Sequence, residues 1–146
     1  MEILYKKPFL IVGYRIETNW SNLFLEIPRT WKKLYHQSTK IKNKIDNRFF
    51  EISLEKKDEI YTEILCAEVS EIESIPEGMI GMTIPAQSYV NNKHYGSRNK
   101  IVDSFREMYS WAKENGYSTG HFKIDYGYFQ KEKEPIDHSL YIKIEI

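Results

Sequence analysis

Apolar and polar residues along the first half of the chain predict a strand followed by a helix. Residues 8–18 (PFLIVGYRIET) are rich in β-branched and aromatic side chains, which favour strands. Apolar residues then recur at spacings of three and four, the period of a helix with one buried face: Leu23, Ile27, Trp31, Leu34 and Tyr35. We expect a helix over 24–38, with Ser21 or Asn22 as its N-terminal cap. Pro28 is expected either to kink this helix or to mark its first turn.

A hairpin is predicted after this helix. Residues 49–54 and 60–69 read as strands, and the polar run 56–59 (KKDE) is the turn between them. Residues 70–78 (SEIESIPEG) contain proline and glycine and show little alternation, so we expect them to be a connection.

The same pattern begins again in the second half. Residues 79–93 form a long strand-like run that Pro85 interrupts, which is typical of an edge strand or a bulge. A second helical stripe follows. Ser97 or Asn99 is its expected cap, and the Asn-Gly pair at 115–116 supplies the left-handed residue that ends the helix. The last two strands are predicted at 120–129 and 139–146.

Each half therefore reads as strand, helix, strand, strand, and we interpret the chain as an internal duplication. The prediction is an α+β fold in a single domain, residues 1–146, with pseudo-repeats at 1–70 and 79–146 related by a pseudo-twofold axis. Each unit is expected to bury one face of an antiparallel sheet against its helix. A cleft is expected where the two units meet, because ligand sites favour such junctions.

Composition and charge narrow the functional classes. Lysine plus arginine and aspartate plus glutamate number 21 each, so the chain has no net charge to hold a nucleic acid or an anionic membrane. No apolar run approaches the roughly 20 residues that span a bilayer, and we expect a cytoplasmic protein. Aromatic residues make up 14% of the chain, more than a core of this size needs, so some are expected to line a pocket.

Catalytic and metal chemistry have little support in the sequence. The single cysteine, Cys66, lies in an apolar run and is expected to be a buried small hydrophobe in a reducing compartment. Of His36, His94, His121 and His138, none has metal-ligand spacing, and the three in predicted turns or helix ends are expected to be solvated. We therefore expect no catalytic residue, no metal and no cofactor.

Several segments together resemble one known family. TIPAQSYVNNKHYGS, FREMYSWAKENGY and SLYIKIEI, with FLIVGYRIETN and CAEVSEIESIPEGMIGMTIPAQSYV before them, are similar to the GyrI-like, or AraC-type effector-binding, family of bacterial proteins. The resemblance runs over residues 2–146 and points especially to stand-alone and integron-associated members. It implies a duplicated strand-helix-strand-strand fold whose central cleft binds small organic molecules, often lipophilic cations. In members fused to a DNA-binding domain this binding controls transcription, and here we expect the sensor module alone.

The family comparison places two charged residues at the expected ligand site. The family's second-half strand typically reads Phe-Glu-x-Tyr, whereas this chain has Lys123 at the Glu position and Asp125 at the Tyr position. Strand alternation puts both side chains on one face, where they either pair with each other or together hold a polar or anionic ligand. Asp125 is the first candidate carboxylate for the cleft. Glu68 is the second, because a carboxylate in an apolar strand is costly without a partner. A solvated position is the alternative for both.

The remaining predicted ligand residues come from both halves. Tyr141 matches the family's tyrosine on the last strand, and Gly13 and Arg15 match its first-strand positions. Gly13 is expected to permit close approach of a ligand, and Arg15 either contacts the ligand or is a surface charge. Three aromatic residues are expected either to line the cleft or to belong to the core: Trp31, Tyr89 and Trp111.

Together these predictions describe a sensor for aromatic or amphipathic compounds, cations among them, that is linked to transcription regulation or to drug buffering. The expected partners are a small organic ligand and either a transcription regulator or DNA gyrase, without direct contact to nucleic acid or membrane. The alternatives are a protein-interaction module of the gyrase-inhibitor type and a weak hydrolase that uses cleft carboxylates.

Overall fold

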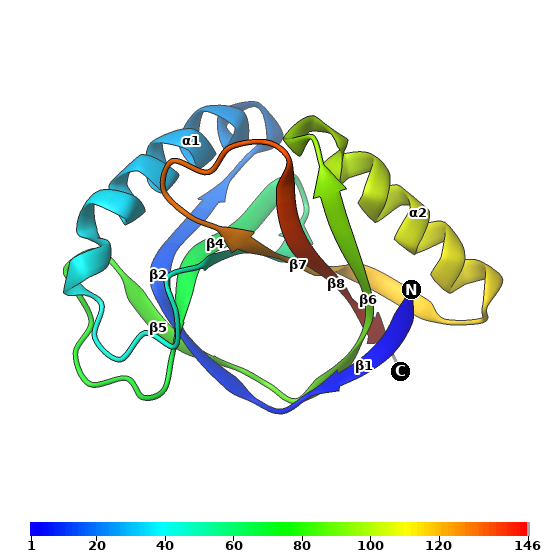
Figure 1. Cartoon of the computed structure of the whole chain (residues 1–146), viewed down its shortest axis with the longest axis horizontal. Coiled ribbons are helices and arrows are strands. Elements are labelled where there is room, and N and C mark those ends of the chain that lie inside the picture. The colour runs from blue at the N-terminus through cyan, green and yellow to red at the C-terminus, as the bar shows by residue number, and fades with distance from the viewer. Residues whose placement is uncertain (146) are drawn as a thin grey trace.

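Eight strands form one antiparallel sheet within residues 1–145, the part of the chain that the computed structural model describes. The helices α1 (Trp20–Gln37) and α2 (Ile101–Glu114) lie on the outer side of this sheet (Figure 1). Short 3-10 helices, η1 (Ser38–Lys40) and η2 (Arg98–Lys100), follow α1 and precede α2. The strands are β1 (Glu2–Lys6), β2 (Phe9–Thr18), β3 (Phe49–Lys57), β4 (Ile60–Val69), β5 (Ile80–Ile84), β6 (Gln87–Gly96), β7 (Ser118–Tyr128) and β8 (Ile136–Glu145).

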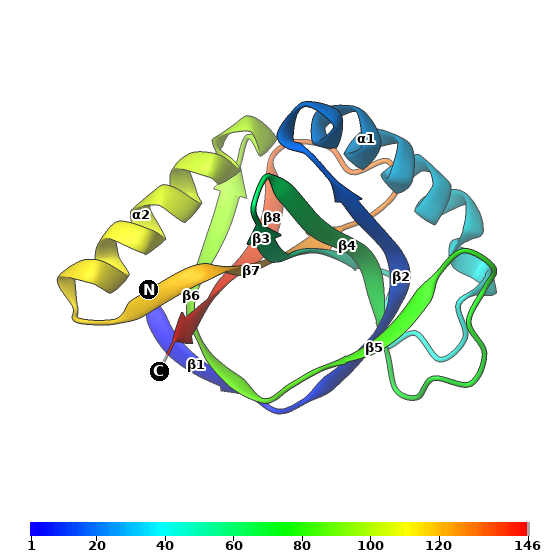
Figure 2. The same cartoon turned by 180° about the vertical axis from the view of Figure 1, so that it is seen from behind.

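The strand order, β1-β6-β8-β7-β3-β4-β2-β5, is symmetrical about the central pair of β7 and β3. Moving outward from that pair, β8 occupies the same place as β4, β6 the same place as β2, and β1 the same place as β5. Each helix packs on one half of the sheet, α1 against β2 and β4 and α2 against β6, β7 and β8 (Figures 1 and 2). The predicted α+β fold, with duplicated units, an antiparallel sheet and two helices, is confirmed.

Each half contains one strand more than the hydrophobic pattern predicts. β1 has mostly exposed side chains and no clear alternation, so it escaped prediction. The run predicted as one strand at 79–93 is divided at Pro85 into β5 and β6. β1 pairs with β6 of the other half, and β5 pairs with β2 of the other half. The two short strands therefore join the halves along both edges of the sheet.

The sheet curls around an apolar interior, and the helices cover its outer face (Figures 1 and 2). Side chains from both halves fill this interior: Phe9, Ile11, Phe50, Ile52, Ile64, Cys66, Ile84, Tyr89 and Ile124. A second core, which includes Leu34 and Leu65, lies beneath α1. A third, which includes Met108 and Leu140, lies beneath α2. Because each helix covers its own half of the sheet, the two helices meet over the central strands. The outer face of these strands therefore lies beneath the junction of the helices.

The start of α1 differs from the prediction. The side chain of Asn19 accepts a hydrogen bond from the backbone N–H of Asn22 at 2.9 Å, so the helix begins at Trp20 and Asn19, rather than Ser21 or Asn22, is its cap. Pro28 lies in the interior of α1 and not in its first turn. The longer helix carries Trp20 to the edge of the junction between the two halves.

The start of α2 also differs, whereas its end is as predicted. Ser97 precedes the 3-10 helix η2 and Asn99 lies within it, and the residue that precedes α2, Lys100, forms no side-chain cap. Gly116 follows the end of α2 with a φ of 79°, the left-handed conformation expected there. No helix within residues 1–145 is long and apolar enough to cross a membrane.

Candidate functional site

A cavity of about 330 Å³ lies between the first turns of α1 and α2, over the central strands β3, β4 and β7. Its wall is apolar and partly aromatic: Trp20, Leu23, Phe24 and Ile27 come from α1, and Ile101, Val102 and Phe105 from α2. Its polar floor comes from the strands: Glu51, Ser53, Glu63, His121, Lys123 and Asp125. The volume is at the lower end of the range for small-molecule pockets.

Strand register brings the residues of the polar floor together. Glu51 lies opposite Asp125, and Ser53 lies opposite Lys123, where β3 pairs with β7. On its other side Ser53 lies opposite Glu63 of β4. Residues directly opposite one another point to the same face of a sheet. Alternation along β7 therefore places Lys123 and Asp125 together, as expected, and the pairing of β3 with its neighbours adds the two glutamates.

Glu63 has one carboxylate oxygen without a partner. The residue is only 6% exposed. Ser53 Oγ donates a hydrogen bond to Glu63 Oε1 at 3.2 Å, whereas Oε2 is buried without a hydrogen-bond partner. Burial raises the pKa of Glu63 to about 7, although the hydrogen bond from Ser53 and the charge of Lys123 oppose the rise. Because a buried carboxylate oxygen is costly to leave unpaired, this atom is available to a polar group that enters the cavity.

Glu51 is a second carboxylate with a raised pKa. Burial and, to a lesser extent, the negative charges of Glu63 and Asp125 raise the pKa of Glu51 to about 8. A hydrogen bond from Trp31 and the charge of Lys123 oppose this rise. At pH 7 Glu51 is therefore mostly protonated and Glu63 is about half protonated. A cation in the cavity would displace these protons, because a positive charge favours the ionised carboxylates.

Two basic side chains share the polar floor. Burial lowers the pKa of Lys123, although the two nearby glutamates oppose this. Its Nζ lies 5.9 Å from the centroid of the Phe105 ring, and within the described part of the chain it forms no ion pair with Asp125. Burial and, to a lesser extent, the charges of two nearby lysines lower the pKa of His121 to about 4, so this ring is neutral at pH 7. His121 Nε2 is buried without a hydrogen-bond partner.

Asp125 belongs to a buried network that extends from the cavity to His138 of β8 and to Glu132, in the loop between β7 and β8. His138 Nδ1 lies 2.7 Å from Asp125 Oδ1, and the Tyr128 hydroxyl donates to Asp125 Oδ2 at 2.6 Å. His138 Nε2 lies 2.7 Å from Glu132 Oε2, and Arg98 Nη2 donates to Glu132 Oε1 at 2.7 Å. Both ring nitrogens of His138 therefore face carboxylates, which favours the doubly protonated imidazolium.

Four of the predicted ligand residues lie on the inner face of the sheet, away from this cavity: Gly13, Glu68, Tyr89 and Tyr141. Glu68 lies opposite Ile11 and Tyr141 lies opposite Ile124, both residues of the interior core. Tyr89 is fully buried there, and its hydroxyl accepts a hydrogen bond from the Gln87 side chain at 2.6 Å. These four residues were predicted for separate reasons, and they share the face of the sheet opposite the polar floor.

Close packing of two strands, and not the approach of a ligand, explains the glycine at position 13. A Cβ atom at this position would overlap the Leu65 carbonyl oxygen and would lie 2.5 Å from Cys66 Cα. The glycine therefore permits the close contact of β2 with β4. This contact involves backbone atoms, which cannot move aside as a side chain can.

The other three predicted residues have different surroundings. Trp31 stacks on Tyr128 at a centroid distance of 4.4 Å and thus lies beside the cavity, which Tyr128 helps to line. Trp111 packs against the core beneath α2 and does not line the cavity. Arg15 is exposed and forms an ion pair with Glu17 at 2.5 Å, as its surface alternative expects.

Most residues of the cavity were not predicted from sequence. Glu63 could have been predicted, because it interrupts an apolar strand in the same way as Glu68. The expectation that the histidines in turns and helix ends are solvated is wrong for His94 and His138, which are buried. Cys66 is a buried small side chain as predicted, and burial raises the pKa of its thiol. Within residues 1–145 no group of three or more His, Cys, Asp or Glu side chains could hold a metal ion.

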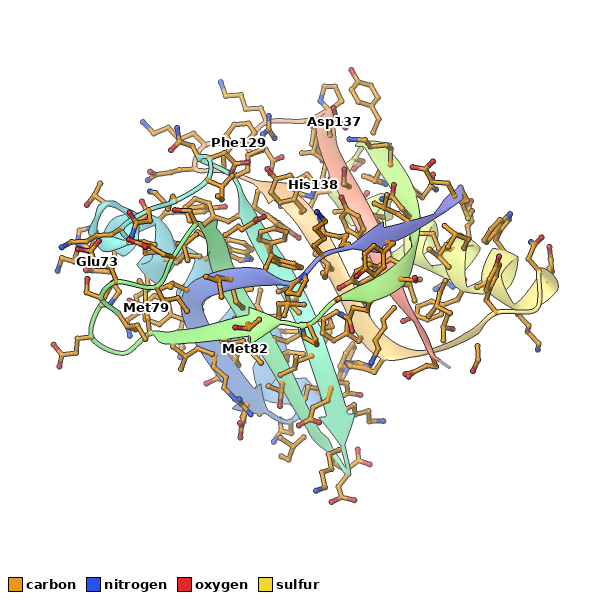
Figure 3. The ribbon with its side chains drawn as sticks, turned by 90° about the horizontal axis from the view of Figure 1, so that it is seen from below. Glu73, Met79, Met82, Phe129, Asp137 and His138 are labelled. Carbon is orange, nitrogen blue, oxygen red and sulfur yellow. The ribbon has the colours of Figure 1, made fainter. Side chains whose placement is uncertain are left out.

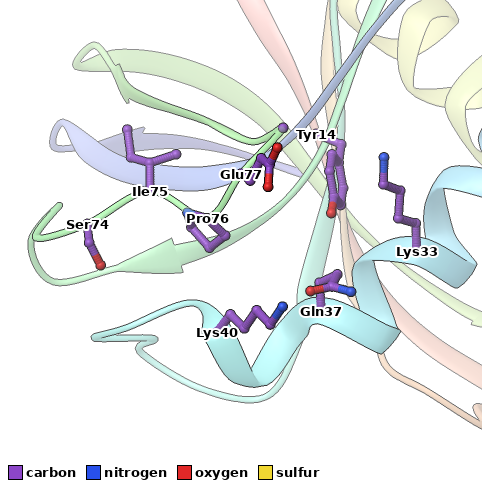
Figure 4. Close-up of a pocket in the computed structure, with 9 residues that line it drawn as sticks. Tyr14, Lys33, Gln37, Lys40, Ser74, Ile75, Pro76 and Glu77 are labelled. Atoms are coloured by element: carbon purple, nitrogen blue, oxygen red, sulfur yellow. The ribbon is translucent and has the colours of Figure 1, made fainter.

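A second, more polar cavity of about 500 Å³ lies between the end of α1 and the connection at 74–78 (Figure 4). Lys33, Gln37 and Lys40 line it from the helix side. Both lysines are exposed, and Lys33 Nζ lies over the Tyr14 ring at 4.7 Å from the centroid. Exposed lysines with mobile side chains make a weaker site than the buried carboxylates between the helices.

Solved structures share this fold along nearly the whole chain. The structure of SAV2435 bound to tetraphenylphosphonium matches with a TM-score of 0.76 and 10% sequence identity, covering 99% of this chain and 93% of that chain. The integron cassette protein VCH_CASS2 from Vibrio cholerae matches with a TM-score of 0.71 and 12% identity, covering 99% and 95%. At such low identities the likeness concerns the fold alone.

Sequence comparison gives the family. The transcriptional regulator BrlR of Pseudomonas aeruginosa is 30% identical over 80 residues, which are 54% of this chain and 30% of the regulator. That match spans less than a third of the regulator's length. The family model described as an integron-associated effector binding protein matches residues 2–146, and the resemblance inferred from the sequence is confirmed. The chain therefore belongs to the family of integron-associated effector-binding proteins.

Proposed function

We propose that this chain binds a small aromatic or amphipathic cation in the cavity between α1 and α2. The observation that carries the proposal is the buried, unpartnered Oε2 of Glu63 beneath an aromatic wall. Aromatic faces attract a cation by roughly 0.5–2 kcal/mol each, and a nearby carboxylate supplies the opposite charge. A cation with an apolar body thus gains both burial and charge neutralisation.

The balance of charges on the polar floor favours a cation over an anion. Burial raises the pKa values of both Glu51 and Glu63, and negative neighbours add to the rise at Glu51 only. A positive charge that enters the cavity favours their ionised forms. An anion would meet the same carboxylates and raise their pKa values further. Lys123 opposes a cation, since its ammonium shares the floor. Arg98 also lines the cavity, but its guanidinium is paired with Glu132 at 2.7 Å. We expect the two glutamates to outweigh the remaining positive charge of Lys123.

Relatives support a sensor role for the bound cation. SAV2435 has been solved with tetraphenylphosphonium, a lipophilic cation, and BrlR is a transcriptional regulator. We infer that residues 1–146 act as one effector-binding domain with pseudo-repeats at 1–70 and 79–146. Ligand occupancy in this domain is linked to a transcription regulator.

Tetraphenylphosphonium is a suitable first probe for the cavity. At 100 times its dissociation constant a ligand adds about 2.7 kcal/mol to the free energy of unfolding, which thermal unfolding detects. Trp20 lines the cavity and Trp111 does not, so Trp20→Phe should lose most of the ligand-dependent fluorescence change and Trp111→Phe should keep it. If neither tetraphenylphosphonium nor an aromatic amine changes the melting temperature or the fluorescence of the wild type, the proposal is contradicted.

Two alternative functions remain predictions: a protein-interaction module of the gyrase-inhibitor type and a weak hydrolase. Co-purification of a gyrase subunit with the ligand-free chain would support the first. Ester hydrolysis that disappears in Asp125→Asn would support the second.

A further inference from the structure

We propose that the cavity selects protonated amines, cations that donate an N–H hydrogen bond, over lipophilic cations of equal charge that carry no N–H. The inference rests on the proposed function, because it specifies the ligand class of the same cavity. It comes from the hydrogen-bonding state of the polar floor and not from its charge alone.

Ser53 orients the Glu63 carboxylate so that one of its oxygens has no partner. Ser53 lies opposite Glu63 in the sheet, is 5% exposed, and donates to Oε1 at 3.2 Å. This contact holds one oxygen and leaves Oε2 as a buried acceptor without a partner. Hydrogen bonds between charged groups are directional and roughly twice as strong as neutral ones. A ligand that donates to Oε2 therefore gains an interaction that charge proximity does not provide.

Lys123, the lysine of the polar floor, does not pair with Glu63 Oε2. Within residues 1–145, Lys123 forms no ion pair with Glu63 and no hydrogen bond to it, and its Nζ lies over the Phe105 ring of α2. Ser53 separates Lys123 from Glu63 in the strand register. The lysine is thus directed toward the α2 side of the cavity, and an amine can reach Glu63 without replacing it.

A second unused polar atom lies on the same floor. His121 Nε2 is buried without a partner, and burial keeps its ring neutral at pH 7. A neutral imidazole nitrogen either accepts an N–H or donates to an oxygen, depending on its tautomer. A primary or secondary amine, which has more than one N–H, satisfies Glu63 and still has a proton to offer to His121. A phosphonium or quaternary ammonium ion satisfies neither.

The test compares two ligands that differ only in their N–H groups. The probes are 4-phenylbutylamine and its N,N,N-trimethyl derivative, titrated into the wild type, Glu63→Met, Glu63→Gln and the exposed control Glu55→Gln. In the wild type and in Glu55→Gln we expect the amine to bind at least about tenfold more tightly, the value of one charge-assisted hydrogen bond. Glu63→Met should reverse the order, since aromatic sites without an acceptor favour the less hydrated trimethylammonium. Glu63→Gln should be intermediate.

The outcomes separate this inference from the proposed function. If both probes and tetraphenylphosphonium bind the wild type but the trimethyl derivative binds as tightly as the amine, amine selection is wrong and cation binding stands. If the amine keeps its advantage in Glu63→Met, the assignment to Glu63 is wrong. If no probe binds a wild-type protein that unfolds cooperatively, both the inference and the proposed function fail.

Discussion

Asp125 and His138 form a buried pair in which Asp125 Oδ1 lies 2.7 Å from His138 Nδ1. Asp125 belongs to the floor of the cavity, and His138 lies in β8, near the loop that follows Phe129 (Figure 3). Through Glu132 this pair extends to Arg98 in the 3-10 helix η2, which precedes α2. The network therefore connects the cavity floor, the loop between β7 and β8, and the turn that leads into one of the two helices of the wall.

Removal of the His138 ring should destabilise the fold. His138 is fully buried, and its loss leaves the carboxylates of Asp125 and Glu132 without their shared partner. Breaking a buried ion pair by removing one member costs roughly 3–5 kcal/mol. We expect His138→Gln to lower the free energy of unfolding by that amount in urea denaturation. The exposed control His36→Gln should change it by less than about 0.5 kcal/mol, and equal effects of the two would argue against the network.

Stability should fall as the pH rises from about 5 to 8.5. Burial raises the pKa of Glu51 to about 8 and that of Glu63 to about 7, from an ordinary value of 4.5. Burial alone would lower the pKa of His138, but hydrogen bonds and charges of its two carboxylate partners raise it above 6.5. A group whose folded pKa is raised stabilises the fold below its unfolded pKa, and this contribution is lost as the pH rises through the folded value.

His121 acts in the opposite direction at acid pH. Its folded pKa is lowered to about 4 from 6.5, so its contribution is present above pH 6.5 and is lost as the pH falls toward 4. The steepest net loss is therefore expected between about pH 6.5 and 8. Urea denaturation across this range measures it, and the double variant Glu51→Gln/Glu63→Gln should flatten the dependence. A wild type whose stability rises over the same range would contradict the assigned shifts.

Replacement of Lys123 should strengthen cation binding. The Lys123 ammonium shares the polar floor with the proposed ligand, and two like charges within one partly buried cavity repel by an amount on the order of 1 kcal/mol or more. We expect Lys123→Met to bind tetraphenylphosphonium about fivefold to tenfold more tightly by isothermal titration calorimetry. Lys113→Met, which removes an exposed charge from the far part of α2, is the control. Weaker binding by Lys123→Met would mean that the lysine contacts the ligand favourably.

A methyl group at Gly13 should destabilise the sheet without affecting a ligand. Its Cβ would overlap backbone atoms of Leu65 and Cys66, so β2 and β4 would have to separate. Overpacking of this kind costs about 1–3 kcal/mol or more, and Gly13→Ala should lower the melting temperature accordingly. At Gly120 the added atom meets the end of the Glu145 side chain, which is exposed and can move. Gly120→Ala should therefore be close to wild type, and an equally mild Gly13→Ala would show that the strands can adjust.

Local patterns predicted the elements and their duplication. The strands at β3 and β4 and the end of α2 at Gly116 were visible because burial on one side imposes a repeat of two or about 3.6 residues, and glycine permits a left-handed residue. β1 was missed, since an edge strand with mostly exposed side chains carries no such repeat. The cap of α1 was misplaced by a few residues because Asn19, Ser21 and Asn22 all have side chains suited to capping.

The cavity depended on contacts between distant segments. Alternation placed Lys123 beside Asp125, but nothing local to either residue indicated that Glu51 lies opposite Asp125 or that Ser53 lies between Lys123 and Glu63. Those relationships follow from the pairing of β3 with β7 across the centre of the sheet. A shift of one residue in that register would turn Glu51 and Ser53 to the inner face. Hydrophobic periodicity is a local property and was sufficient for most of the elements, and the similarity of several segments to a known family was sufficient for the family. The site required the register and helix packing that only the folded chain defines.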